Sequence, residues 1–270
     1  MRVNGRPTLS PNNGTARFRE ASVTRDACSG KITLDTGCGN DNVNVSRSPC
    51  GGYNVCVNGQ NFQFTEQEFK NLEIKTGSGS DKVNIGRGVK GANVNTGSGN
   101  DYVRNAGNGA KINTGSGNDY VANSGHGAKI NTGSGNDAVR SRGHGAQINL
   151  GSGNDAASVR GSGNRIRGGS GNDSVFVRGS RNSISGGSGC DKLFAHGNCN
   201  SIRGGSGWDQ IGVLGNFNRA NGGSGFDRVN GFGFGNQLRG GFDLFFDQVS
   251  NRGPAPWALG PAAFLLGLRA

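Results

Sequence analysis

From residue 94 onward, aliphatic residues recur at two positions in every eighteen, with glycines and polar residues between them. A single aliphatic residue between polar neighbours is typical of a very short strand with one inward side chain. Two such strands and two turns make one 18-residue coil. The first set is Val103, Val121, Val139, Ala157, Val175, Leu193, Ile211 and Val229, and the second is Ile112, Ile130, Ile148, Ile166, Ile184, Ile202, Ala220 and Leu238.

Coils of equal length can stack in register, so that each strand pairs with its copy above and below. The sequence therefore predicts an all-β fold, a right-handed parallel β-helix (a β-roll solenoid) with 18-residue coils and a small irregular N-terminal cap. The expected divisions are a disordered segment at 1–22, a cap with the first loops of the repeat and an inserted hairpin about Asn58-Gly59 at 23–93, the regular β-roll at 94–250, and an apolar tail at 251–270 that caps the helix or serves as a secretion signal.

Composition indicates that the predicted core is thin. Only 31% of the 270 residues are hydrophobic, while 53 are glycine. Ordering the chain costs about 1 to 2 kcal/mol per residue, and one aliphatic layer from each wall does not offset this by itself. A further source of stability is therefore expected.

The aspartates point to that source because they recur in strict register. The eight from Asp101 to Asp227 are spaced eighteen residues apart, and each closes a six-residue unit such as TGSGND or GGSGND. Calcium prefers six to eight oxygen ligands, and glycines at positions two and four of the unit allow the loop to turn its carbonyls toward one point. The candidate metal residues are Asp81, Asp101, Asp119, Asp137, Asp155, Asp173, Asp191, Asp209 and Asp227, with Gly97, Gly99, Gly115, Gly117, Gly133, Gly135, Gly151, Gly153, Gly169, Gly171, Gly187, Gly189, Gly205, Gly207, Gly223 and Gly225.

These units resemble the RTX, or haemolysin-type, calcium-binding repeat, strongly over 94–240 and loosely over 31–93. The resemblance implies a Ca²⁺ ion between each pair of stacked loops. Eight registered aspartates define seven such gaps, and the interval from Asp81 to Asp101 adds an eighth. The resemblance also implies export by a type I system through an uncleaved C-terminal signal, with folding outside the cell.

The opposite turns of the coil depart from the family pattern. Their aspartate position is occupied by Ala110, Ala128 and Ala146 and then by an asparagine column that starts at Asn164. We therefore expect calcium along one edge only and an asparagine hydrogen-bond ladder along the other. The competing interpretation is that the aspartates merely cap turns. A column of like charges without a cation would repel itself, which argues against that interpretation.

The function expected from these features is a secreted calcium-binding repeat protein that folds on calcium binding and acts as a scaffold or effector. The alternative is a calcium-dependent adhesin or binding module for an anionic polysaccharide or cell surface, because the formal net charge is +11 and basic residues occupy outward strand positions. Ice binding fits less well, since the third loop position is serine instead of threonine. An enzyme is not expected, because H-E-x-x-H and G-x-S-x-G motifs are absent from the sequence.

The remaining expectations concern location and smaller features. The N-terminus lacks the apolar region of a secretory signal and no stretch reaches the length of a membrane span, so a secreted or extracellular monomer without a cleaved signal peptide is expected. His126 and His144 should stack on the surface, and Cys50 with Cys56 is the favoured disulfide of the cap. The aromatic C-terminal end is interpreted either as a partner surface or as the place where the tail folds back as a cap.

Overall fold

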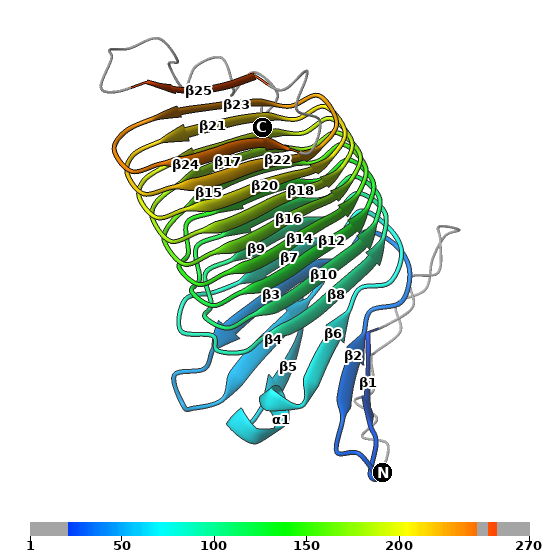
Figure 1. Cartoon of the computed structure of the whole chain (residues 1–270). Coiled ribbons are helices and arrows are strands. Elements are labelled where there is room, and N and C mark those ends of the chain that lie inside the picture. Colours follow the sequence, from blue (N-terminus) through cyan, green and yellow to red (C-terminus); the bar gives the residue numbers. More distant parts are fainter. Residues whose placement is uncertain (1–20, 242–247, 253–270) are drawn as a thin grey trace.

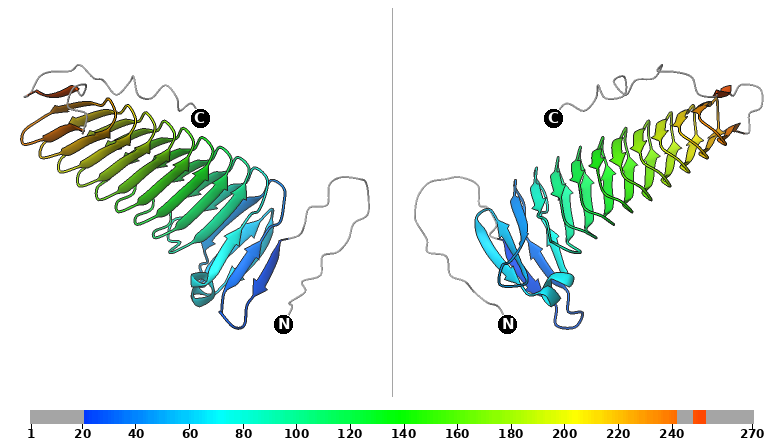
Figure 2. Two further views of the ribbon diagram at one scale, coloured as in Figure 1. Left: turned by 45° about the vertical axis from the view of Figure 1, so that its right-hand side comes forward. Right: turned by 90° about the vertical axis from the view of Figure 1, so that its left-hand side faces the viewer.

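The computed structural model describes residues 21–241 and 248–252. Two long sheets face each other, and the chain passes from one to the other twice in every coil, so that the coils stack into a rod (Figures 1 and 2). The first sheet has 12 strands and the second has 13. This arrangement confirms the predicted parallel β-solenoid.

Sheet 1 is made of β1 (Ser22–Arg25), β2 (Ile32–Asp35), β6 (Leu72–Lys75), β8 (Asn93–Ser98), β10 (Lys111–Ser116), β12 (Lys129–Ser134), β14 (Gln147–Ser152), β16 (Arg165–Ser170), β18 (Ser183–Ser188), β20 (Ser201–Ser206), β22 (Arg219–Ser224) and β24 (Gln237–Gly241). Sheet 2 is made of β3 (Asn42–Arg47), β4 (Tyr53–Val57), β5 (Gln60–Phe64), β7 (Lys82–Ile85), β9 (Tyr102–Asn105), β11 (Tyr120–Asn123), β13 (Ala138–Ser141), β15 (Ala156–Arg160), β17 (Ser174–Arg178), β19 (Lys192–His196), β21 (Gln210–Leu214), β23 (Arg228–Phe232) and β25 (Gln248–Arg252).

Strand pairing follows the 18-residue period of the sequence. Ile112 pairs with Ile130 in sheet 1, and Val121 pairs with Val139 in sheet 2, both in parallel register. These side chains are at most 3% exposed, and the aliphatic residues of the other coils join them in one continuous core. Aliphatic residues therefore stack on aliphatic residues in every coil, and in sheet 1 isoleucine stacks on isoleucine from Ile112 to Ile202.

The N-terminal cap departs from the parallel pattern. β1 pairs antiparallel with β2, and the expected hairpin is formed by β4 and β5, which turn at Asn58 and Gly59. A short helix, α1 (Glu66–Lys70), lies between the hairpin and β6. Thr65 and Glu68 form a capping box at its start, and Phe69 is buried against Tyr53.

The interior is more polar than the sequence pattern predicts. The short strands of sheet 2 carry a second inward residue two positions after the aliphatic one, and in β9, β11 and β13 this residue is polar: Asn105, Asn123 and Ser141. Asn105 donates a hydrogen bond to Asn123, which in turn donates one to Ser141. From β15 to β21 the same position is apolar, as it is in β3 and β7, and it is occupied by Val159, Val177, Ala195 and Val213.

A predicted cap or secretion signal at 251–270 lies almost wholly outside the described residues, as does most of the expected disordered segment at 1–22. Within the part of the chain that is described, no helix has the length and apolar character needed to cross a membrane.

Candidate metal centre along the aspartate edge

Each coil has two edges, and all the registered aspartates lie at the edge where a strand of sheet 1 leads into a strand of sheet 2. We call this the aspartate edge, and the return turn from sheet 2 to sheet 1 the mid-coil edge. The aspartate side chains point into the solenoid, and those from Asp81 to Asp227 are 1 to 2% exposed. The structure thus brings all nine predicted carboxylates into one internal column.

The column is held by a hydrogen bond that repeats in every coil. The backbone N–H of Asp101 donates to Oδ1 of Asp119 at 2.8 Å, and the N–H of Asp119 donates to Oδ1 of Asp137 at 2.8 Å. The same bond joins the coils from Asp41 to Asp227. From Asp81 onward, one oxygen of each carboxylate is therefore fixed by a backbone N–H of the preceding coil.

The other carboxylate oxygen is buried without a hydrogen-bond donor in eight coils, from Asp81 to Asp209. A buried ionised oxygen that lacks a partner is costly, so these groups favour a proton or a cation. Burial raises the pKa of every one of these eight carboxyls, to about 6 for Asp101 and Asp155 and to about 7 for Asp173 and Asp209.

In the N-terminal coils a threonine occupies position one of the six-residue unit and fills the space beside the carboxylate. The Thr96 hydroxyl lies against the Asp101 carboxyl and lowers its pKa, and it also donates to the backbone carbonyl of Thr114 at 3.1 Å. A hydroxyl has one hydrogen, so these two acceptors compete for it. We call the coils of Thr76, Thr96, Thr114 and Thr132 the threonine coils.

In the C-terminal coils position one is glycine, and the carboxylate moves into the space that threonine fills elsewhere. A Cβ atom placed on Gly186 would lie 2.1 Å from Oδ2 of Asp191 and 2.7 Å from the carbonyl oxygen of Gly204. Two acceptor oxygens therefore approach the same small space. We call the coils of Gly168, Gly186, Gly204 and Gly222 the glycine coils; Leu150 occupies the position between the two groups.

The loop glycines are needed for close stacking. Gly97 has φ +101°, and a Cβ there would lie 2.0 Å from the carbonyl oxygen of Gly77, closer than any side chain permits. The sequence predicts that these loops aim their carbonyls at one ion. In the structure the carbonyls of Gly77 and Ser116 each accept an N–H from an adjacent coil, which leaves each oxygen one lone pair.

Sequence reasoning left Asp41 out of the site, although it closes the unit TGCGND. The structure places Asp41 at the start of the same column, where its N–H donates to Asp81 Oδ1 at 2.8 Å. Both of its carboxylate oxygens have donors, since Asn58 donates to Oδ1 at 2.6 Å and Thr36 donates to Oδ2. The matching hexapeptide was the available signal, but the 40-residue interval to Asp81 hid the register.

The mid-coil edge carries the expected asparagine ladder. The backbone N–H of Asn164 donates to Oδ1 of Asn182 at 2.9 Å, as in the aspartate column, and Nδ2 of Asn164 donates to the same oxygen at 3.1 Å. The next coil repeats both bonds between Asn182 and Asn200. The amide supplies a second donor to the adjacent coil, which an ionised carboxylate cannot do.

The donor set of the aspartate column is entirely oxygen. Each gap is bordered by carboxylates of two adjacent coils and by backbone carbonyls, which suits a hard cation. Within the described residues, no three groups drawn from histidine, cysteine, aspartate and glutamate are clustered as a metal site. A cation in a gap would therefore depend on backbone carbonyls for much of its coordination.

The other candidate residues do not join this column. His126 and His144 stack as predicted, with ring centroids 5.3 Å apart, and their Nδ1 atoms accept backbone N–H groups of the following coils. The predicted disulfide between Cys50 and Cys56 is wrong, because all six cysteines are free. Trp208 is 63% exposed near the C-terminal end of the described solenoid.

Comparisons of the chain with protein-family models, with curated proteins and with solved structures find no match. The class of protein is therefore defined by the fold and the site, as a parallel β-solenoid with a buried ladder of aspartates at 18-residue spacing. These features are compatible with a calcium-binding repeat protein.

Proposed function

We propose that this protein is a calcium-binding repeat protein in which Ca²⁺ ions along the aspartate edge complete the fold. The observation that carries the proposal is the buried carboxylate oxygen without a donor, repeated from Asp81 to Asp209. On the mid-coil edge the same backbone geometry is completed by an amide donor. On the aspartate edge, a cation would be the positive partner of the carboxylate oxygen. The amide N–H has that role on the mid-coil edge.

Calcium suits this column better than other common cations. Zinc favours nitrogen and sulfur ligands, which the edge does not bring together. Magnesium demands near-ideal octahedral geometry and usually keeps several waters, whereas calcium accepts many oxygens in flexible arrangements. The unpartnered carboxylate oxygens and the remaining lone pairs of the loop carbonyls offer ligands of the kind that calcium accepts.

The glycine coils are the strongest candidates for occupied gaps. Asp173, Asp191 and Asp209 each direct an unpartnered oxygen toward the carbonyl of the next coil's position-one glycine. Bound calcium would neutralise carboxylates that burial otherwise drives toward protonation. Because calcium is scarce inside cells and abundant outside, such a chain would fold after export, in agreement with a proposed role as a secreted scaffold or effector.

The test is thermal unfolding of the full chain at neutral pH, followed by circular dichroism in millimolar calcium and in a chelator. If several sites are filled at about 100 times their Kd, calcium should raise Tm by about 10 °C or more. Titration calorimetry should show more than one ion per chain, and magnesium at equal concentration should give a much smaller shift.

The matched control is the variant D173N/D191N/D209N, which keeps the size of each side chain and removes three charges. It should lose most of the calcium-dependent rise in Tm while remaining folded in the chelator. An identical Tm with calcium and with chelator in the natural chain would contradict the proposal.

A further inference from the structure

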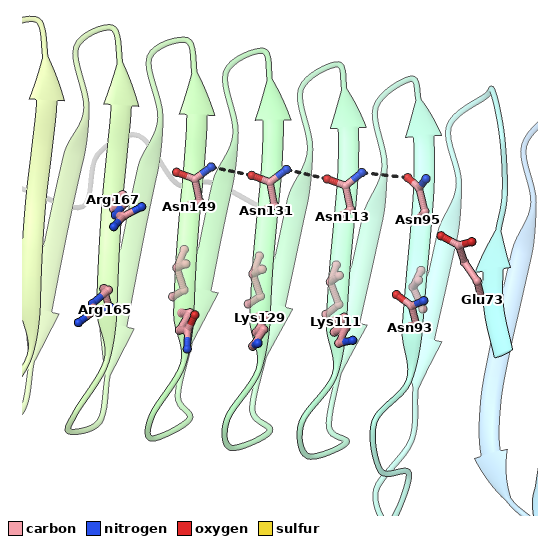
Figure 3. A pocket seen from close by; sticks show the side chains of 15 residues that line it. Glu73, Asn93, Asn95, Lys111, Asn113, Lys129, Asn131, Asn149, Arg165 and Arg167 are labelled. Atoms are coloured by element: carbon pink, nitrogen blue, oxygen red, sulfur yellow. Dashed lines mark hydrogen bonds between the residues drawn. The ribbon is translucent and has the colours of Figure 1, made fainter. Parts of the chain in front are cut away.

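An open groove crosses the outer face of sheet 1 from β6 to β16, on the side of the wall away from the core. It has a volume of about 430 Å³, and its polar side chains come from six successive strands. Figure 3 shows these side chains in two rows that run along the solenoid axis. Because each strand lies about 4.8 Å from the next, the groove presents a regularly repeated surface.

One row of the groove is an asparagine ladder. Asn113 donates from Nδ2 to Oδ1 of Asn95 at 3.0 Å, and Asn131 and Asn149 repeat this bond at 2.7 Å (Figure 3). Each interior amide uses one N–H and one oxygen lone pair in the ladder, which leaves one of each. Such a row can donate to and accept from hydroxyl groups in every coil.

Positive charge lies beside and beyond this row. Lys111 and Lys129 occupy the second row, and Arg165 and Arg167 close the C-terminal end of the groove (Figure 3). All four are exposed, and none forms an ion pair with a carboxylate of the described residues. Glu73, the acidic residue of the lining, is paired with Lys31 at 2.8 Å.

From this arrangement we infer that the groove binds an extended polysaccharide that carries carboxylate groups, of the uronate class. The ladder amides would bind sugar hydroxyls, and the lysines and arginines would bind the uronate carboxylates. A polymer of repeating units that lies along the solenoid axis would meet a ladder amide in each coil from β8 to β14.

Other extended anions fit the groove less well. The lining residues include no aromatic side chain on which a nucleic-acid base could stack. An acidic peptide cannot add as a further strand, because β8, β10, β12 and β14 already have neighbours on both sides. The groove also lies on a wall face, away from the aspartate edge, so the inference does not rest on calcium binding.

The test measures binding of hyaluronan to the calcium-treated full chain by titration calorimetry, with fully methyl-esterified hyaluronan as the uncharged probe. The natural chain should bind the first and not the second. The variant R165Q/R167Q and the variant K111Q/K129Q should each weaken binding by about tenfold, since each removes two exposed charge contacts. Raised salt should weaken binding in the natural chain.

The matched control is R104Q/R140Q, which removes two exposed charges from the outer face of sheet 2 and should leave affinity within about twofold of the natural chain. All variants are checked for the natural circular dichroism spectrum. Equal loss in the control and groove variants would overturn the inference, as would equal binding of the esterified probe. Tighter binding of a thymidine oligonucleotide than of hyaluronan would assign the groove to nucleic acid instead.

Discussion

The threonine coils and the glycine coils share one backbone but treat the same buried carboxylate differently. In the threonine coils, the hydroxyl of Thr96 stands beside the Asp101 carboxyl and also reaches the next coil's carbonyl. In the glycine coils, the carboxylate of Asp191 turns into the space where a threonine Cβ would be. One group of coils thus fills the gap with protein atoms, and the other leaves two oxygens facing it.

This difference shows how a repeat protein can vary its ion sites without changing its fold. Threonine supplies volume and one hydrogen to the gap, so part of the cost of burying the carboxylate is offset within the chain. Glycine supplies neither. In keeping with this, a threonine hydroxyl lowers the pKa of the carboxyl in the threonine coils, and no hydroxyl does so for Asp173, Asp191 or Asp209, although burial raises the pKa in both groups. We therefore expect calcium to stabilise the glycine coils more than the threonine coils.

The largest effect should be the pH dependence of stability without calcium. The raised carboxyl pKa values mean that between about pH 4 and pH 7 the native chain binds more protons than the unfolded chain, whose carboxyls have ordinary pKa values. The free energy of unfolding should therefore be highest near pH 4 and fall by several kcal/mol as the pH rises to about 7.5. Urea unfolding in a chelator, repeated at several pH values across this range, measures the change in the free energy of unfolding.

Calcium should remove or reverse this dependence, because the ion binds the ionised carboxylates and replaces the proton. The same urea series in millimolar calcium is the control. A metal-free chain whose stability rises with pH between 4 and 7 would show that the carboxylates are already satisfied by the protein.

Removing carboxylate charge should change the stability of the two groups of coils by different amounts, and this effect should be smaller than the pH dependence. D191N/D209N places amides in the glycine coils, where each can donate to the next coil as Asn164 does on the mid-coil edge. The metal-free chain should gain about 1 to 3 kcal/mol, while the calcium-dependent part of the stability falls. Urea unfolding with calcium and with chelator gives both quantities.

The matched pair is D119N/D137N in the threonine coils. Because the threonine hydroxyls lie beside these carboxyls and lower their pKa, both changes should be smaller. If the two double variants give the same result, position one does not control the site, and the comparison between the coils fails.

Much of this architecture was predictable because the repeat fixes spacing. An interval of eighteen residues between aspartates, with Val121 two positions after Asp119, is enough to place one aliphatic residue in each wall. Register then follows in the regular part, since coils of equal length place equivalent residues beside one another. The asparagine column at the mid-coil edge was predictable for the same reason, from the shared spacing of Asn164 and Asn182.

Whether a polar side chain points into the solenoid or toward solvent was harder to predict, because the same residue type occurs at both kinds of position. Asn105 is buried, whereas Asn100 is exposed in the loop and accepts the N–H of Asn118. The signal for the inward position was alternation: Asn105 lies two residues after the buried Val103, and Val159 takes the equivalent place in a later coil. The arrangement at Asp41 was hidden because the hairpin interrupts the period.

The smallest effect should come from exchanging the position-one residues themselves. T114G opens the gap beside Asp119 and should cost about 1 to 2 kcal/mol without calcium, through lost burial and greater backbone freedom. It should also increase the rise in Tm that calcium gives. G186T should do the opposite, because its Cβ would lie 2.1 Å from Asp191 Oδ2 and must force the carboxylate back to the arrangement of the threonine coils.

T114V distinguishes space from hydrogen bonding, since valine keeps the volume of threonine but has no hydroxyl. If space governs the site, T114V should leave the calcium-dependent rise in Tm at the natural value while T114G increases it. If T114V increases that rise as much as T114G does, the hydroxyl is what suppresses calcium binding in the threonine coils. In that case the shared hydrogen of Thr114, and not its volume, separates the two groups of coils.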